Sequence, residues 1–382
     1  MNELNATERP QHDSAARPRK AAFLLRDLGE GGAERSSLRL ANGLARQEGW
    51  RVSLFLLKDK GPLRSAVRPE VEVVDLKGSF FRLLRELRFR EVEFLLPVYT
   101  SMRALLAKAL LSLTKPDSPA GNMKVILSQR NMFTMDRGPL QIRLRFLRCR
   151  LLYPWAAACV CISEGVAEEM KTLGLLPPEK IHVVYNPVLT EEMSMQMEAL
   201  LEHPWFAPEA GPVVLGVGRL GDQKDFATLI RAFALLTPQY PNLRLVILGE
   251  GKQRPDLEKL IRELGLEARA SLPGYISNPY PWMKRAALFV LTSRFEGFGN
   301  VVAEALACGC NVVATDCKSG PKEILDQGRC GRLARVGDAA DVARAMKEAL
   351  DSPLPPETLR ERAAFFSEDR AVEGYCRVMN SL

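Results

Sequence analysis

The sequence lacks the long apolar segments that place a chain in a membrane. No run of about 18 apolar residues occurs in it, so we expect no transmembrane helix. The first 20 residues are polar, and the apolar run after them is too short for a secretory signal, so residues 1–20 are interpreted as a disordered leader. Because 47% of the residues are hydrophobic and 26% are charged, a chain that is disordered or fibrous throughout is excluded. A folded cytoplasmic protein is expected.

Histidine is scarce, and the eight cysteines are scattered along the chain. The histidines are His12, His182 and His203. Two pairs of cysteines, Cys159/Cys161 and Cys308/Cys310, have one residue between the partners, whereas zinc sites usually have about two to four. Both pairs lie in apolar segments, so we expect buried free thiols rather than disulfides or a metal site.

The positive charge is unevenly distributed. The formal net charge is +7, but residues 76–150 alone carry 15 basic and 5 acidic residues, and residues 191–382 are slightly acidic. Basic and apolar residues are mixed in 80–90 and 143–152, which suits contact with an anionic membrane surface. An ordinary solvated helix packed on a sheet is the alternative. No nucleic acid partner is expected, because no nucleic-acid-binding motif occurs and the basic stretch is too apolar for a polyanion groove.

Strand-like and helix-like segments alternate in two successive series, which predicts two α/β domains with parallel sheets. The first series begins with the apolar run Ala21–Leu28, and the second begins at Val213–Val217, after a proline-containing connection within 188–210. We assign residues 21–187 to a first domain and 188–357 to a second. Both are expected to be Rossmann-like and to face each other across a cleft at the carboxyl ends of their strands.

The strongest motif, SRFEGFGNVVAEA, joins a predicted strand to a predicted helix in the second half. Gly297 and Gly299 allow a tight turn and the close approach of a ligand. Asn300 occupies the expected N-cap position, so the amides of Val301 and Val302 would point outward. A helix N-terminus of this kind predicts an anion site suited to a diphosphate.

Two carboxylates and two cations accompany that anion site. Glu296 in the loop and Glu304 in the helix can both face the cleft and accept hydrogen bonds from sugar or ribose hydroxyls. At the end of the second domain's first strand, Gly218 precedes Arg219, and Lys224 follows five residues later. Cations in this position are placed to neutralise phosphates.

Together these motifs resemble the glycosyltransferases of family 4, the retaining, nucleotide-sugar-dependent group with the GT-B fold. In the second half the matching strings are GVGRLGDQKDFATLIRAF, LVILGEG, LPGYISN, EGFGNVVAEALACG and SGPKEIL. In the first half they are GGAER, ISEGVAEEM and VVYNPV. The resemblance covers residues 21–380 and is most specific in the second domain.

The resemblance implies a nucleotide-sugar donor, a UDP- or GDP-sugar, held mainly by the second domain. Arg219 and Lys224 would hold the diphosphate and stabilise the departing nucleoside diphosphate. Glu304 would bind the ribose hydroxyls, and Glu296 would bind and orient the donor sugar. The catalytic residues implied are therefore Glu296, Arg219 and Lys224.

The resemblance also implies contacts around this donor site. The loop at Gly274 and Tyr275 would border the base, and Gly31 and Gly32 would let the first domain approach the diphosphate and the acceptor. The last segment, 358–382, would form a helix that returns to the first domain. The implied acceptor is a lipid-linked oligosaccharide, a lipopolysaccharide or an exopolysaccharide at the cytoplasmic face of the membrane; a small soluble acceptor is the alternative.

The sequence departs from the family where many members have a catalytic-region histidine. Arg130 and Asn131 stand there instead, and we assign them to the donor sugar or the acceptor. No base for the acceptor hydroxyl is assigned, and a donor phosphate oxygen can accept that proton. No Asp-x-Asp pair occurs, so neither a metal nor another cofactor is expected.

An NAD(P)-dependent oxidoreductase is the competing enzyme class. Its glycine fingerprint is incomplete, because Glu34 occupies the position of the third glycine after Gly29 and Gly31.

Overall fold

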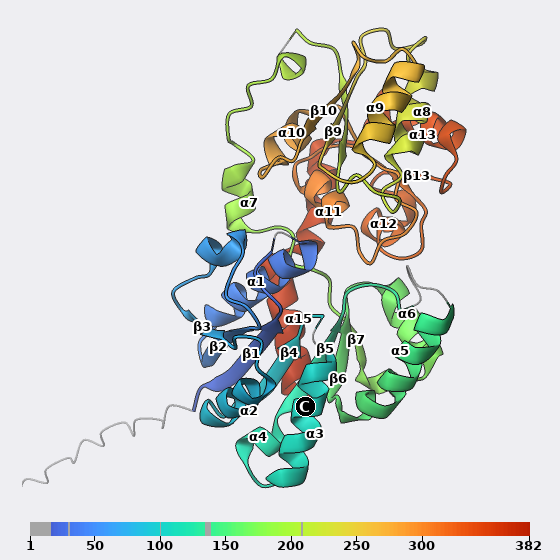
Figure 1. Ribbon diagram of the computed structural model, residues 1–382. Helices are drawn as coiled ribbons and strands as arrows, with labels where there is room; N and C mark the ends of the chain where they lie inside the picture. Colours follow the sequence, from blue (N-terminus) through green and yellow to red (C-terminus); the bar gives the residue numbers. More distant parts are fainter. Residues whose placement is uncertain (1–16, 30, 100, 134–138, 208) are drawn as a thin grey trace, which may run out of the picture.

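Two parallel β-sheets, one in each half of the chain, organise the computed structural model (Figure 1). The structure describes residues 17–29, 31–99, 101–133, 139–207 and 209–382. Within these residues the first sheet has seven strands in the order β3-β2-β1-β4-β5-β6-β7, and the second has six in the order β10-β9-β8-β11-β12-β13. All of these strand pairs are parallel. The expected pair of Rossmann-like α/β domains is confirmed.

The elements have the following bounds. The strands are β1 Arg19–Leu25, β2 Trp50–Leu56, β3 Val71–Asp75, β4 Phe94–Pro97, β5 Lys124–Gln129, β6 Ala158–Cys161, β7 Ile181–Val183, β8 Val213–Val217, β9 Arg244–Leu248, β10 Ala270–Gly274, β11 Leu288–Leu291, β12 Val312–Thr315 and β13 Arg332–Ala334. The helices are α1 Gly32–Ala45, α2 Phe80–Phe89, α3 Ser101–Thr114, α4 Pro119–Asn122, α5 Pro139–Leu152, α6 Glu164–Leu173, α7 Glu191–Gln196, α8 Phe226–Leu236, α9 Arg254–Glu263, α10 Tyr280–Arg285, α11 Asn300–Ala307, α12 Pro321–Ile324, α13 Ala339–Asp351, α14 Pro356–Ala363 and α15 Glu368–Asn380.

The range 1–20 predicted for a leader overlaps the first strand. Residues 1–16 lie outside the described residues, and β1 already begins at Arg19. The Arg19 guanidinium lies over the rings of Trp50 and Phe94 and forms a 2.9 Å ion pair with Glu93. These contacts with the two neighbouring strands stabilise the charged side chain of Arg19 at the start of β1.

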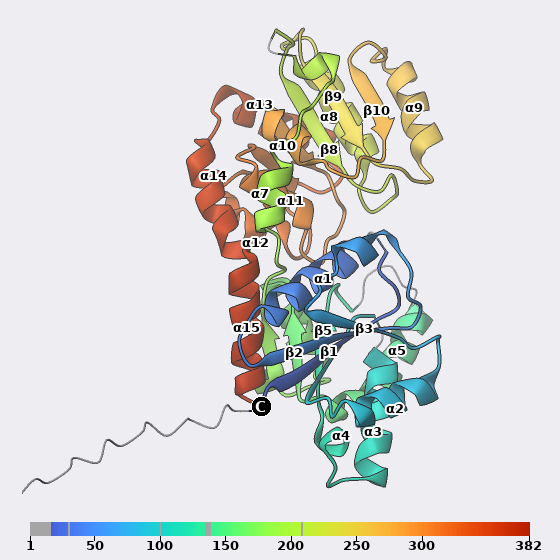
Figure 2. The same ribbon diagram turned by 90° about the vertical axis from the view of Figure 1, so that its left-hand side faces the viewer.

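Helices cover both faces of the first sheet (Figure 2). Buried residues of α2, α3 and α5 pack against one face, for example Leu87 and Leu105. Residues of α1 and α15, such as Leu44 and Tyr375, pack against the other face. The first domain is therefore completed by a helix that follows the second domain in sequence.

The terminal segment 358–382 is two helices rather than the single helix expected. α14 packs against α11 of the second domain, whereas α15 packs against α1 of the first. Ser367 separates them in an extended conformation, and its hydroxyl caps α15 by accepting from the amide of Arg370. Only α15 therefore reaches the first domain.

The chain crosses between the domains twice, and the two crossings are bonded to each other. The amides of Val188 and Leu189 donate to the carbonyl of Phe366 at 2.8 and 3.0 Å, and the amide of Glu368 donates to the carbonyl of Leu189 at 3.0 Å. Arg39 of α1 donates to the carbonyl of Val188 at 2.9 Å. The connection is thus a short two-stranded ribbon held by the first domain.

Candidate active site

The loop between β11 and α11 carries the main motif and is tied to the loop that follows β8. Thr292 Oγ1 donates to the carbonyl of Lys224 at 3.0 Å. The amide of Arg294 donates to the carbonyl of Gln223 at 2.8 Å, and Gln223 Nε2 donates to the carbonyl of Phe295 at 3.0 Å. Two segments about 70 residues apart in sequence are therefore fixed side by side at the carboxyl ends of adjacent strands.

This pairing brings Lys224 and Glu296 together. Lys224 Nζ donates to Glu296 Oε1 at 2.7 Å, and the two side chains are only 15% and 9% exposed. Ser293 Oγ donates to the same oxygen at 2.7 Å. Burial and, to a smaller extent, the charge of Glu296 raise the pKa of the neighbouring Cys317 thiol to about 12. The carboxylate is thus held at Oε1 by a cation and a hydroxyl, which leaves Oε2 for a ligand.

Arg219 and the N-terminus of α11 add positive charge to the same region. The side chain of Arg219 is exposed and has no ion pair within the described residues. The N-cap of α11 is Gly299, at φ 95°, and no side chain caps the helix. An uncapped N-terminus leaves amides available to an anion.

The expectation that Asn300 caps α11 is wrong. The left-handed backbone of Gly299 makes the turn, and Asn300 is the first helical residue. Its side chain crosses to the first domain, where Asn300 Oδ1 accepts from Asn186 Nδ2 at 2.9 Å. The amide of Val302 donates to the carbonyl of Gly299 at 2.8 Å, so it does not face a ligand, and the amide of Val301 remains.

Glu304 lies one turn into α11, where the first domain reaches the second. Its side chain is buried and has no hydrogen bond within the described residues. Burial lowers the pKa of Arg35 on α1, but Tyr280 and Glu304 outweigh that effect and raise it. Arg39 Nη2 donates to the Tyr280 hydroxyl at 3.1 Å. Arginines of the first domain therefore border the carboxylate expected to bind ribose.

The predicted loop residues of both domains lie at the ends of their elements. Gly218 and Gly274 have positive φ values of 156° and 96° at the ends of β8 and β10, and Tyr275 is half-exposed. Gly31 is the N-cap of α1, which also has no side-chain cap. A Cβ on Gly32 would lie 3.5 Å from Asn300 Nδ2, so the N-termini of α1 and α11 meet across the domains.

The structure separates the roles of Arg130 and Asn131. Arg130 is buried, and its guanidinium donates to Ser128 and Ser37, at 2.9 Å each, and to the side chains of Ser36 and Asn186. This arrangement favours a structural role over contact with the donor sugar or the acceptor. Asn131 is exposed, and its Oδ1 lies beside Gly297, where a Cβ would contact it at 2.8 Å.

Three polar residues that join the domains were not identified from the sequence. Ser163 Oγ of the first domain donates to the carbonyl of Gly297 at 2.9 Å and shares a 2.6 Å hydrogen bond with Ser319 Oγ of the second, and Asn186 links Arg130 to Asn300. The strings ISEGVAEEM, VVYNPV and SGPKEIL each contain one of the three residues. Ser163 is the N-cap of α6, but nothing in its spacing indicates that its hydroxyl also bonds the other domain.

The chain was compared with protein-family models and with curated proteins. A model described as "Glycosyl transferases group 1" matches residues 201–365, and one described as "Glycosyltransferase Family 4" matches residues 30–192. The chain is 30% identical over 361 residues to N-acetylgalactosamine-N,N'-diacetylbacillosaminyl-diphospho-undecaprenol 4-alpha-N-acetylgalactosaminyltransferase of Campylobacter jejuni, a match that covers 90% of this chain and 93% of that protein. It is 28% identical over 359 residues to the lipopolysaccharide core biosynthesis glycosyltransferase LpsE of Rhizobium meliloti, covering 92% and 96%.

Solved structures with the same architecture include Alr3699/HepE of Anabaena. It matches with a TM-score of 0.76 and 20% identity over 95% of this chain and 100% of that chain. The lipopolysaccharide outer core galactosyltransferase WaaB matches with a TM-score of 0.71 over 95% of this chain and 99% of that chain. With the two family models and the full-length relatives, this likeness leads to one conclusion: the chain belongs to glycosyltransferase family 4 and is a glycosyltransferase with the GT-B fold.

Proposed function

We propose that the enzyme transfers a sugar from a UDP-sugar, with retention of configuration, to a lipid-linked or polysaccharide acceptor at the cytoplasmic face of a membrane. The observation that carries the proposal is the buried pair Lys224–Glu296 beside Arg219 and the uncapped N-terminus of α11. A carboxylate that can bind sugar hydroxyls is thus adjacent to cations that can bind a diphosphate.

In this proposal some site residues bind the leaving group and others bind the sugar. Arg219, Lys224 and the amide of Val301 hold the diphosphate, and Glu304 binds the ribose. As the bond from the sugar C1 to the diphosphate oxygen breaks, the negative charge grows on the diphosphate, where these groups stabilise it. Glu296 holds the sugar while the acceptor oxygen bonds to C1 from the same face. The acceptor proton passes to a diphosphate oxygen.

The similar proteins support UDP and a lipid-linked or polysaccharide acceptor. Anabaena HepE was solved with UDP, with UDP and glucose, and with UDP-glucose. The Campylobacter jejuni relative is named for an acceptor on diphospho-undecaprenol, and LpsE is named for lipopolysaccharide core biosynthesis. The coverage of nearly the full length of both relatives supports a common activity for the whole chain.

We also propose that transfer needs no metal ion. In the described part of the chain, no three histidine, cysteine, aspartate or glutamate side chains are grouped as metal ligands would be. The positive side chains and the helix N-terminus supply the charge that a metal would otherwise provide.

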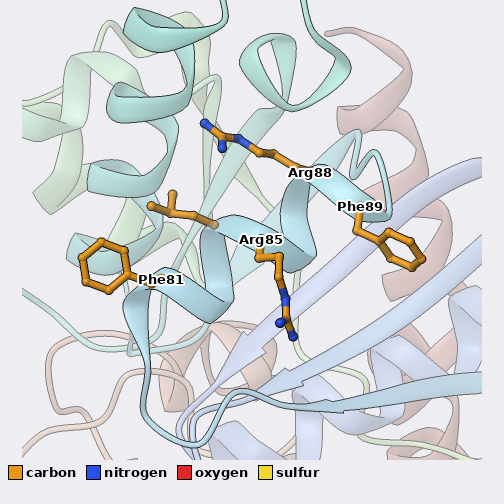
Figure 3. Close-up of a pocket in the computed structure, with 5 residues that line it drawn as sticks. Phe81, Arg85, Arg88 and Phe89 are labelled. Carbon is orange, nitrogen blue, oxygen red and sulfur yellow. The ribbon is translucent and has the colours of Figure 1, made fainter.

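A surface of α2 supports the proposed membrane contact (Figure 3). Phe81 and Phe89 are 82% and 80% exposed, and they flank Arg85 and Arg88 around an open hollow of about 470 Å³. Figure 3 shows the rings at opposite ends of the helix and the guanidinium groups extending away from it. Exposed aromatic rings and arginines on one helix are typical of helices that lie in the interface of an anionic membrane.

The neighbouring helices also carry exposed apolar residues. α3 lies against both α2 and α5. Its exposed leucines are Leu106, Leu110 and Leu113, and those of α5 are Leu140, Leu144, Leu147 and Leu151. Both sets follow helical spacing, so each forms one stripe on its helix. No helix in the described ranges is long and apolar enough to span a bilayer. We call these residues, with Phe81 and Phe89, the apolar surface, and propose that it lies on the membrane.

A donor and acceptor screen tests the proposed reaction. With bacterial lipid extract as acceptor, UDP-sugars should release UDP, GDP-sugars should release little GDP, and EDTA should leave the rate within about twofold because no metal carries the leaving-group charge. UDP should also raise the melting temperature, by mass action on the folded state, and NAD should not. Stabilisation by NAD alone, or loss of turnover in EDTA, would contradict the proposal.

Vesicle sedimentation tests the apolar surface. Replacing Leu147 and Leu151 together with glutamate should lower binding to anionic vesicles at least about tenfold, because two apolar contacts are lost and two negative charges are added. Leu235→Glu is the control, since Leu235 is 54% exposed on α8 of the second domain. Equal sedimentation of the two variants would contradict the proposal that the apolar surface lies on the membrane. Wild-type binding to neutral vesicles that equals its binding to anionic vesicles would also contradict it.

A further inference from the structure

Three side chains of the first domain come from the carboxyl ends of adjacent strands. In the sheet, β1, β4 and β5 are consecutive neighbours. Glu34 lies in the first turn of α1, which follows β1; Tyr99 follows β4; and Asn131 follows β5. The carboxyl ends of parallel strands meet at one edge of the sheet, which is where such folds bind their ligands.

Tyr99 has an unusual backbone conformation and an exposed ring. Its φ is +57°, in the left-handed region that a bulky residue rarely adopts, and strain of this kind is concentrated at functional sites. Its side chain is 61% exposed. The hydroxyl is hydrogen-bonded to the side chain of Asn131, and the charged groups that face it are Arg130 and Glu34. The polar end of Tyr99 is thus fixed while most of the residue remains accessible.

Glu34 and Asn131 place hydrogen-bonding groups beside this ring. The Glu34 carboxylate folds back over the N-cap Gly31, where a Cβ would overlap its Oε2. It has no ion pair within the described residues, so it can accept hydrogen bonds from hydroxyls. Asn131 Oδ1 lies beside Gly297, which directly follows Glu296. Through Asn131, this group of three residues in the first domain therefore approaches the Glu296 carboxylate, which we propose holds the donor sugar.

We propose that Tyr99, Glu34 and Asn131 form the subsite for the terminal sugar of the acceptor. The Tyr99 ring packs against the apolar C–H face of a pyranose, and Glu34 and Asn131 bind its hydroxyls. The sugar that receives the new bond is then held opposite Glu296. This inference rests on the proposed function, since it concerns the acceptor of the same reaction.

Saturation-transfer NMR on the full chain with bound UDP tests the subsite directly. The probes are the methyl α-glycosides of glucose, galactose and N-acetylgalactosamine. At least one should receive saturation at its ring protons from the wild-type protein. Tyr99→Ala should lower that signal at least about fivefold, whereas Tyr99→Phe, which keeps the ring, should retain most of it. Glu34→Gln should weaken binding about threefold or more, because a charge-assisted hydrogen bond becomes a neutral one.

One further measurement and one control variant distinguish this role from a structural one. The rise in melting temperature caused by UDP should be the same in Tyr99→Ala and in the wild type, because the ring does not contact the nucleotide. Phe365→Ala is the control, since Phe365 is an exposed aromatic residue, 47% accessible, in the turn between α14 and α15. The subsite is overturned if Tyr99→Ala keeps the wild-type signal, or if the wild type gives none with all three glycosides. Failure of the proposed function is a different result: no turnover of any UDP-sugar.

Discussion

Replacing Lys224 with alanine is expected to lower kcat for sugar transfer by about 100- to 1,000-fold. Lys224 Nζ lies 2.7 Å from Glu296 Oε1 in a site with little access to solvent, so water cannot replace the charge that it supplies. The negative charge on the diphosphate grows as the sugar leaves. The loss should therefore appear in kcat more than in the KM for the donor.

Initial rates over a range of UDP-sugar concentrations measure this effect. Lys259→Ala is the matched control, because Lys259 forms an exposed ion pair with Glu263 on α9 of the same domain, at 3.6 Å. The control should keep the wild-type kcat, since exposed pairs of this kind contribute little. A kcat near wild type in Lys224→Ala would exclude the lysine from the catalytic site.

Changing Glu296 to glutamine is expected to lower kcat by about 10- to 100-fold, the equivalent of one charge-assisted hydrogen bond. The carboxamide keeps the shape of the side chain but removes the charge that pairs with Lys224. Because Lys224 and Glu296 are hydrogen-bonded to each other, the double variant should lose little more activity than Lys224→Ala alone.

A double-mutant cycle on kcat tests this coupling. The exposed pair Lys259 and Glu263 provides the control cycle, in which all three variants should resemble the wild type. Circular dichroism and the UDP-induced rise in melting temperature establish that the variants are folded. Strictly additive losses at Lys224 and Glu296 would show that the two residues act independently.

The positions of the groups proposed to bind the donor were predictable where these groups lie on one short continuous segment. The Gly297–Gly299 turn, Glu296 and Glu304 belong to one loop and the helix after it, so their order in the sequence fixes their positions. The capping of α11 was not predictable from residue type. A glycine in the left-handed region made the turn, and Asn300 was left to bond the first domain.

The first domain was less predictable because its polar residues bond partners distant in sequence. Arg130 follows a strand like a ligand-binding residue, yet its guanidinium is held by Ser36, Ser37 and Asn186, between 56 and 94 residues away. No local pattern encodes such contacts.

The return of α15 to the first domain has a consequence for synthesis on the ribosome. The first domain leaves the ribosome first, but the helix that covers one face of its sheet is made only after the whole second domain. Domains usually complete their folding in the order of translation, and here that order is reversed. The apolar residues that α15 covers therefore stay exposed in the nascent first domain until the second domain has been translated. A chain that stalls in the second domain leaves both domains incomplete.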